Sequence, residues 1–249
     1  MFILAGIGNN IDEIPIGVIK WIKKADFVFL ESYTNFLDKN SLKFLKKIRN
    51  DIKIVDRKFV EEKLEKLILK NPNKKIVLLV SGSPLFATTH ISLIVFCKVN
   101  NISYKILNAP SIFDEIGKIG ISLYKFGRII SIPFHESESF FMDLINNIRN
   151  NLHTLILLDI DPKNDKYVSV KEALERILKL EDKYKTGLID VNKEIIVCSN
   201  LGRKNEKVLI GKISDFLNLD LDPPICIIFP ANLNEIEKEN IYNLFKVYK

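Results

Sequence analysis

Cysteine and histidine are scarce in this chain of 249 residues. The three cysteines, Cys97, Cys198 and Cys226, lie far apart and show no C-x-x-C spacing, which is typical of buried thiols in a reducing compartment. The three histidines have no spacing suited to a metal, so we predict no metal site. No apolar run is long enough to cross a membrane, and the short apolar N-terminus lacks the basic residues of a secretory signal. These absences predict a cytoplasmic protein without a membrane partner.

The chain also has no long run of charges of one sign. The chain carries 37 Lys and Arg against 31 Asp and Glu, a formal net charge of +6. Along the sequence the lysines are scattered among Asn, Ile and acidic residues, whereas a nucleic-acid binder concentrates them on one face or arm. This pattern is typical of a compositional bias, so we do not expect a nucleic-acid partner. The alternative is a weak preference for an acidic or nucleic-acid-bound partner.

What the first half of the chain does contain is a regular alternation of apolar runs and helical patterns. Strands are predicted at 1–7, 27–30, 52–55, 76–80 and 104–107, and helices at 16–24, 60–69 and 89–99. The clearest strand is the β-branched run at 76–80, which Gly82, Ser83 and Pro84 bring to an end. The alternation predicts a mostly parallel sheet covered by helices on both faces.

The alternation ends at Pro110. Beyond it we predict strands at 129–132, 154–159, 194–199, 207–210 and 225–229, with helices at 138–148 and after Ser169. A last helix, capped by Asn234, is expected to bury Ile241, Leu244, Phe245 and Tyr248. The consecutive runs at 194–199 and 207–210 predict an antiparallel pair. The sequence therefore predicts an α/β fold in two domains, 1–110 with a mostly parallel sheet and 111–249 with a mixed one.

Small and polar side chains follow the predicted strands, where open α/β sheets bind their ligands. Gly8 follows the first strand, Gly82 and Ser83 follow the central one, and Asp159 ends a later one. There are no paired carboxylates, no Cys–His dyad and no metal-ligand cluster, so no catalytic residue is assigned. The string 88–90, Thr-Thr-His, opens a helix, where capping is sufficient to explain it. This composition favours chemistry by positioning, such as group transfer from an activated donor.

Several short segments carry a further pattern, including Ala-Thr-Thr-His at 87–90 and Tyr-Lys-Phe-Gly-Arg at 124–128. The others lie at 31–34, 55–57, 108–112, 152–155, 158–160 and 222–224. In this order and at these separations they resemble the diphthine synthases, methyltransferases of the tetrapyrrole-methylase superfamily. The resemblance implies a homodimer of two-domain α/β chains, with S-adenosylmethionine in a cleft between the domains and S-adenosylhomocysteine as the product. It also implies a substrate, translation elongation factor 2, methylated on the amino group of a 3-amino-3-carboxypropyl adduct of one histidine during diphthamide biosynthesis.

Carried over by position, the resemblance implies eight cofactor contacts. These are Asn9, Ser83, Phe86, Ser111, Ile112, Leu158, Leu201 and Ile225. Three of them depart from the family pattern: Ser83 replaces an aspartate, Ile225 replaces a histidine, and Asn9 stands where the family is usually apolar. Tyr124, Arg128 and His90 are candidates to orient the attacking amine, and none is assigned as a general base.

Two other hypotheses stay open at this point. The departures at Ser83 and Ile225 are compatible with a catalytically impaired homologue that still binds elongation factor 2. The basic charge and the implied fold are compatible with a related methyltransferase that acts on RNA or on a tetrapyrrole. The first of these alternatives predicts weak cofactor binding, and the second predicts a salt-dependent affinity for RNA.

Overall fold

The computed structural model describes residues 1–248. The chain divides into two compact units, each described here by itself. The first unit comprises Met1–Phe113 with Pro162–Asn164, and the second comprises Asp114–Asp161 and the chain from Asp165 onward. No helix among residues 1–248 is long and apolar enough to span a bilayer.

The first unit is built around a five-stranded sheet in the order β3-β2-β4-β1-β5, and every strand pair in it is parallel. The strands are β1 (Phe2–Gly6), β2 (Phe27–Glu31), β3 (Lys53–Val55), β4 (Ile76–Val80) and β5 (Tyr104–Leu107). The predicted parallel sheet is therefore confirmed. Because all strands run the same way, the loops after β4, β1 and β5 leave from one edge of the sheet, on three neighbouring strands.

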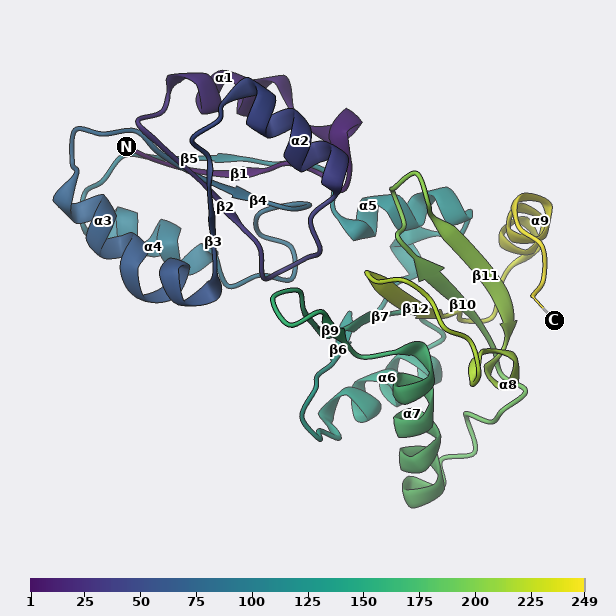
Figure 1. Ribbon diagram of the computed structural model, residues 1–249. Helices are drawn as coiled ribbons and strands as arrows, with labels where there is room; N and C mark the ends of the chain where they lie inside the picture. The colour runs from purple at the N-terminus through teal and green to yellow at the C-terminus, as the bar shows by residue number, and fades with distance from the viewer. Residues whose placement is uncertain (249) are drawn as a thin grey trace. The chain divides into compact units, whose positions relative to one another are not determined.

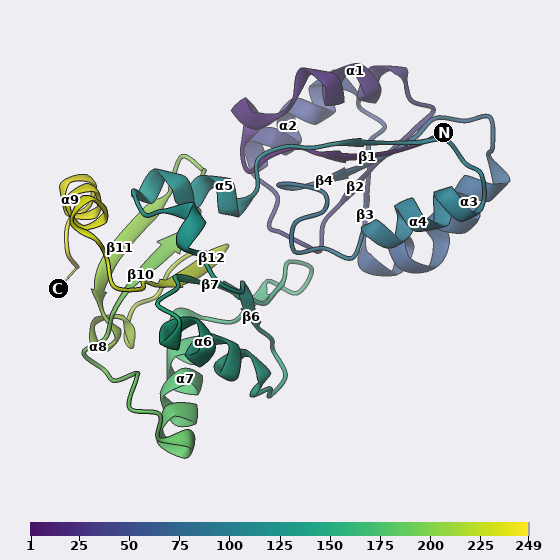
Figure 2. The same cartoon turned by 180° about the vertical axis from the view of Figure 1, so that it is seen from behind.

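Helices cover both faces of this sheet (Figures 1 and 2). On one face lie α1 (Ile16–Lys24) and α2 (Lys39–Ile48), and on the other lie α3 (Leu64–Lys70), α4 (Ile91–Val99) and a π-helical turn, η2 (Phe59–Lys63). Alternate strand residues serve the two layers: Phe2 and Leu4 pack with the α3 and α4 side, whereas Ile3 and Ala5 pack with the α1 and α2 side. This two-sided burial explains why β1 and β4 are continuous apolar runs.

Helix α2 was not among the sequence predictions. Asp38 caps it, because its Oδ2 accepts a hydrogen bond from the Ser41 N–H at 2.7 Å. Within the helix only Ser41 and Leu45 are buried, while four of its ten residues are lysines. Leu42, Leu45 and Ile48 stand at helical spacing and pack on the core, so this segment carries the local signals of a capped amphipathic helix.

The second unit contains a mixed five-stranded sheet in the order β11-β10-β12-β7-β6. The strands are β6 (Ile130–Ile132), β7 (Thr154–Leu158), β10 (Glu194–Ser199), β11 (Lys207–Lys212) and β12 (Ile225–Phe229). Only β6 and β7 are parallel, and the predicted antiparallel pair β10–β11 is present. A short hairpin, β8 (Ile160–Asp161) with β9 (Lys166–Tyr167), follows β7.

Helices α6 (Ser139–Arg149) and α7 (Val170–Tyr184) pack on one face of this sheet. The predicted cap of α7 is present, since Ser169 Oγ accepts from the Glu172 N–H at 3.1 Å. The remaining helical segments are α5 (Ile112–Ile116), η3 (Gly117–Ile119), η4 (Leu123–Lys125), α8 (Ile213–Phe216) and α9 (Glu235–Leu244), with η1 (Ile11–Glu13) in the first unit.

The last helix departs from its prediction in one respect. Asn234 caps α9 as expected, and Ile241 is buried. Leu244, however, is 58% exposed. Leu244 is the last residue of α9, and only Glu237 and Ile241 of this helix are buried, so its final turn lies outside the core. Tyr248 instead pairs with a neighbouring strand, through its N–H to the Ile210 carbonyl at 2.7 Å.

Candidate functional site

The loops that follow β1 and β4 are joined to each other at the carboxyl edge of the first sheet. The Gly82 N–H donates to the Gly8 carbonyl at 2.8 Å, and the Gly8 N–H donates to the Gly82 carbonyl at 3.3 Å. Both glycines have φ near +70°, a conformation that side chains rarely adopt. At Gly6 a Cβ atom would lie 2.5 Å from the Gly82 carbonyl oxygen and 2.8 Å from Pro84 Cδ. The convergence of the two loops therefore requires glycine at all three positions.

Asn9 lies buried directly behind this junction. Its backbone N–H donates to Glu13 Oε2 at 2.7 Å, and its side-chain Nδ2 donates to the same oxygen at 3.2 Å. The Asn9 amide is thus held by the short helix that follows it. This arrangement accounts for a polar residue at a position where an apolar one is usual in the resembling family.

Four predicted residues follow two strands at the same edge of the sheet: Ser83 and Phe86 come after β4, and Ser111 and Ile112 come after β5. Ser83 is half-buried, and its hydroxyl makes no hydrogen bond with any of residues 1–248. The Phe86 ring stacks on that of Phe113, with centroids 6.2 Å apart and planes 22° apart. Ser111 is buried, and its Oγ accepts a hydrogen bond from the Phe113 N–H at 3.2 Å. The first unit thus brings five of the eight predicted residues, Asn9 included, to three neighbouring strand ends.

The other three predicted residues lie together in the second unit. Leu158 ends β7 and Ile225 begins β12, and the antiparallel register places them opposite each other, since Leu157 pairs with Cys226. Ile225 also faces Ser199 on β10. The Asn200 N–H donates to the Pro224 carbonyl at 2.8 Å, which fixes the start of the loop that holds Leu201. Leu158 and Ile225 are thus buried neighbours on adjacent strands, and Leu201 is buried in the turn that follows β10. A cofactor cleft shared with the first unit stays a prediction.

His90 is buried below the loop that follows β4. Its Nδ1 lies 3.2 Å from the Pro84 carbonyl, which can only accept, so Nδ1 carries the proton and Nε2 accepts from the Tyr33 hydroxyl at 3.0 Å. Burial lowers the pKa of His90, which favours this neutral form. Both ring nitrogens are occupied within the first unit. His90 therefore holds the loop at 83–90 in place and is not available to a substrate amine.

Tyr33 and Glu31 support the candidate site through His90, and neither was a candidate residue in the sequence. Glu31 is fully buried at the end of β2, and its Oε2 accepts from the N–H groups of Tyr33 and Thr34, each at 3.1 Å. Its other oxygen accepts from the Thr34 hydroxyl. The carboxylate thus fixes the turn that presents Tyr33 to His90. The available signal was the segment 31–34, which belongs to the resembling pattern.

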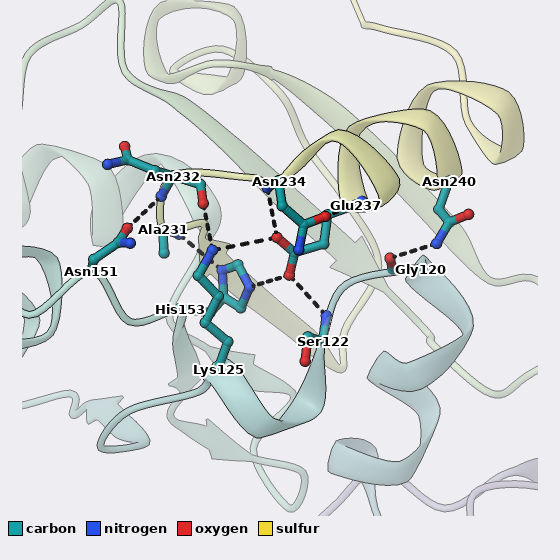
Figure 3. Close-up of polar contacts among 10 residues, drawn as sticks. All are labelled: Gly120, Ser122, Lys125, Asn151, His153, Ala231, Asn232, Asn234, Glu237 and Asn240. Carbon is teal, nitrogen blue, oxygen red and sulfur yellow. Dashed lines mark hydrogen bonds and ion pairs between the residues drawn. The ribbon is translucent and has the colours of Figure 1, made fainter.

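A buried polar cluster in the second unit holds the segment 122–128 (Figure 3). His153 is fully buried, and its Nδ1 accepts from the Ala231 N–H at 2.9 Å, which leaves the proton on Nε2. That proton is donated to Glu237 Oε1 at 3.0 Å, the same oxygen that accepts from the Ser122 N–H at 3.1 Å. Lys125 adds an ion pair with Glu237 Oε2 at 3.4 Å.

The pKa values of this cluster follow from its hydrogen bonds. Burial opposes ionisation of Glu237, but hydrogen bonds from the Asn234 N–H, from His153 and from the Ser122 N–H outweigh it and lower the pKa to about 2. Burial also lowers the pKa of His153. The pair is therefore a carboxylate and a neutral imidazole, and it anchors the backbone on both sides of Tyr124.

Tyr124 and Arg128 are the exposed residues of this segment. The Tyr124 side chain is fully exposed at the tip of η4. Arg128 forms an ion pair with Asp143 at 3.0 Å, with 73% of its own side chain accessible. Both side chains are exposed to solvent in the second unit, on a segment that the cluster around Glu237 holds in place. Among residues 1–248 no group of three or more His, Cys, Asp or Glu is arranged to hold a metal ion.

The chain is similar to known proteins both in sequence and in structure. Residues 1–217 match the family "Tetrapyrrole (Corrin/Porphyrin) Methylases". The chain is 36% identical to a diphthine synthase of Methanococcus aeolicus over 96% of both proteins, and 33% identical to one of Sulfurisphaera tokodaii over 98% of both. A solved structure of a putative diphthine synthase from Entamoeba histolytica has 27% identity and a TM-score of 0.84, covering 98% of this chain and 99% of that one. The resemblance read from the sequence is thereby confirmed.

Proposed function

Since this chain belongs to the diphthine synthases of the tetrapyrrole methylase family, we propose that it methylates the amino group of the 3-amino-3-carboxypropyl adduct on a histidine of translation elongation factor 2. The relationship over nearly the whole chain carries this proposal. Family membership makes the protein an S-adenosylmethionine-dependent methyltransferase. The amino group, the adduct and the elongation factor are the proposed details.

The residues at the strand ends of the first unit fit this cofactor. Gly6 and Gly8 let the protein's own loops pack closely together, and Gly82 leaves its backbone more open, because the nearest atom to an added Cβ would be Asn9 Oδ1 at 3.6 Å. Ser83 offers a hydroxyl that no described residue uses, and the stacked Phe86 and Phe113 rings offer an apolar surface. We propose that Ser83, Phe86, Ser111 and Ile112 bind the cofactor, with Asn9 supporting their loop. Leu158, Leu201 and Ile225 would contribute apolar contacts and backbone groups.

When bound, S-adenosylmethionine would supply an activated methyl group: a neutral amine attacks the methyl carbon in line, the carbon–sulfur bond breaks, S-adenosylhomocysteine leaves, and the methylated ammonium releases a proton. The chain therefore needs to align the amine and to exclude other orientations, and alignment alone contributes several kcal/mol, roughly 7–11 at best. His90 keeps the loop at 83–90 fixed through Tyr33 and the Pro84 carbonyl. Tyr124 and Arg128 stay candidates to orient the adduct, and Arg128 has the planar group suited to a carboxylate.

The partners follow from the same relationship. We propose elongation factor 2 as the protein substrate and a homodimer as the working assembly. Sedimentation equilibrium tests the assembly directly, because a dimer doubles the mass calculated from the sequence. A single species at the monomer mass at micromolar concentration would contradict the homodimer and would leave the proposed reaction untouched.

Transfer of a labelled methyl group tests the proposed reaction. Elongation factor 2 that carries the unmethylated adduct is incubated with the protein and methyl-labelled S-adenosylmethionine, alongside factor without the adduct. We expect label only in the adduct-bearing factor. A Methanococcus aeolicus diphthine synthase serves as the positive control. Absence of label with this chain alone would contradict the proposal and favour an impaired homologue, and label in added RNA would favour the RNA-directed alternative.

A further inference from the structure

Lysines that are scattered along the sequence gather on one face of the first unit. Helices α1 and α2 lie side by side over the same face of the sheet (Figures 1 and 2). Together they contain seven lysines and no aspartate or glutamate. We call this set the lysine face: Lys20, Lys23, Lys24, Lys39, Lys43, Lys46 and Lys47. All seven are exposed, and none forms an ion pair within residues 1–248.

The spacing of these lysines makes the face continuous. On α1 they stand at positions i, i+3 and i+4, and on α2 at i, i+4, i+7 and i+8, so each set forms one stripe along its helix. Four of them surround a shallow, open depression floored by Leu42. Two of the nearby acids are engaged elsewhere: Asp38 caps α2, and Asp26 pairs with Lys74.

The lysine face also accounts for the charge of the whole chain. Without its seven lysines the sequence holds 30 Lys and Arg against 31 Asp and Glu, so the remainder is nearly neutral. The opposite helical layer illustrates this balance, because Phe59–Lys63 and Leu64–Lys70 carry three glutamates and three lysines. A compositional bias alone would distribute the surplus over the surface. Here seven lysines without an acidic residue among them are gathered on two adjacent helices.

We propose that the lysine face binds the phosphate backbone of a nucleic acid without regard to base sequence. Protein–protein interfaces are depleted in lysine and rely on exposed aromatic or arginine anchors. Neither helix contains arginine, and the aromatic residues Trp21 and Phe44 are packed against the core. A membrane-bound face needs apolar side chains to insert, whereas Ile16 is the one large apolar residue of these helices that is mostly exposed. Ammonium groups in rows suit phosphates, which supply affinity but no sequence specificity.

Fluorescence anisotropy with a labelled RNA duplex and a DNA duplex of the same sequence tests the proposal. The first variant replaces Lys39, Lys43, Lys46 and Lys47 with Gln. The matched control replaces Lys58, Lys63, Lys66 and Lys70 with Gln. These four lysines are also exposed and form no ion pair, and they lie in or directly before the opposite helical layer, which contains Glu61, Glu62 and Glu65. We expect the unaltered protein to bind at low salt, with an affinity that falls as salt rises. The first variant should bind about tenfold more weakly and have a smaller salt slope, by roughly 0.9 for each DNA phosphate that it no longer neutralises.

The outcomes separate the possible partners. If the protein binds both duplexes, the lysine face recognises the phosphate backbone that RNA and DNA have in common. If it binds only one duplex, that result identifies which nucleic acid supplies the phosphates. Equal losses in the two variants would overturn the proposal, because they would reflect net charge rather than a face. Tighter binding of poly-glutamate or of phosphatidylserine vesicles than of either duplex would also overturn it, in favour of an acidic protein or a membrane. Thermal unfolding of both variants verifies that they are folded, and neither alters a residue of the proposed cofactor site.

Discussion

At the residue scale, three glycines determine where the candidate site can form. The sequence places Gly8 and Gly82 just after two predicted strands, and Gly6 within the first of them. The structure supplies the reason for them: the two loops exchange backbone hydrogen bonds, and Gly6 leaves no room for a Cβ atom. Such crowding depends on a neighbouring strand far away in the sequence, so no local pattern could have revealed it.

Replacing Gly6 with Ala should separate the two loops and weaken cofactor binding. The new Cβ would meet the Gly82 carbonyl oxygen at 2.5 Å, and backbone cannot move away as a flexible side chain can. We expect at least a tenfold loss of affinity for S-adenosylhomocysteine, about 1.4 kcal/mol, measured by calorimetric titration. Gly17→Ala is the matched control, because nothing lies within 4 Å of its added Cβ. Unchanged affinity in the Gly6 variant would show that the loop junction does not shape the site.

Ser83 allows a second test at this scale. Its hydroxyl has no partner among residues 1–248, so Ser83→Ala should leave the fold intact while it weakens cofactor binding by about 1 kcal/mol, the usual size of one neutral hydrogen bond. Ser83→Asp restores the residue that is usual in the resembling family and should bind at least as tightly as the serine. The measurement is the same titration, accompanied by a thermal melt. Equal affinities in all three proteins would remove Ser83 from the site.

At the scale of elements, strands were easier to predict than the contacts that support them. The buried strands and the cap of α7 followed from apolar runs and from Ser169, because both signals are local. Helix α2 was not predicted, although Leu42, Leu45 and Ile48 stand at helical spacing after Asp38. Leu244 was predicted to be buried, but the final turn of α9 lies outside the core, which depends on tertiary packing. The cluster that links His153 to Glu237 spans 84 residues of sequence and was out of reach of any local pattern.

Glu237→Gln should destabilise the second unit and alter its response to acid. At neutral pH the loss of the carboxylate leaves the His153 and Ser122 donors with a poorer acceptor, at a cost of about 1–3 kcal/mol. The pKa of Glu237 falls from an ordinary value of 4.5 to about 2 on folding, so its ionisation stabilises the fold above pH 4.5. That stabilisation is lost as the pH falls from 4.5 towards 2.

Urea unfolding at a series of pH values checks this prediction. The difference in unfolding free energy between the original protein and Glu237→Gln should be largest near neutral pH and shrink progressively below pH 4.5. Glu239→Gln, which alters an exposed residue of the same helix, should leave the stability within about 0.5 kcal/mol at every pH. A pH-independent difference for Glu237→Gln would show that its carboxyl titrates normally in the folded protein.

At the scale of the whole molecule, two kinds of sequence information gave different results. The alternation of strands and helices predicted a parallel and a mixed sheet, and the resembling segments predicted the family, since both survive in a linear reading. The distribution of charge along the sequence did not predict the lysine face. Lysines on α1 and α2 are separated in sequence by residues 25–38 and become neighbours only once both helices pack on the sheet. Surface patches are properties of the fold, and a count along the chain does not detect them.

The central claim is that this chain is an active methyltransferase directed at the modified histidine of elongation factor 2. Peptide mass spectrometry of the adduct-bearing factor, after incubation with the protein and S-adenosylmethionine, tests it most directly. We predict methyl increments on the modified peptide, with fragments that place them on the amino group of the adduct. An unaltered peptide, beside full conversion by a diphthine synthase of Methanococcus aeolicus under the same conditions, would contradict the account.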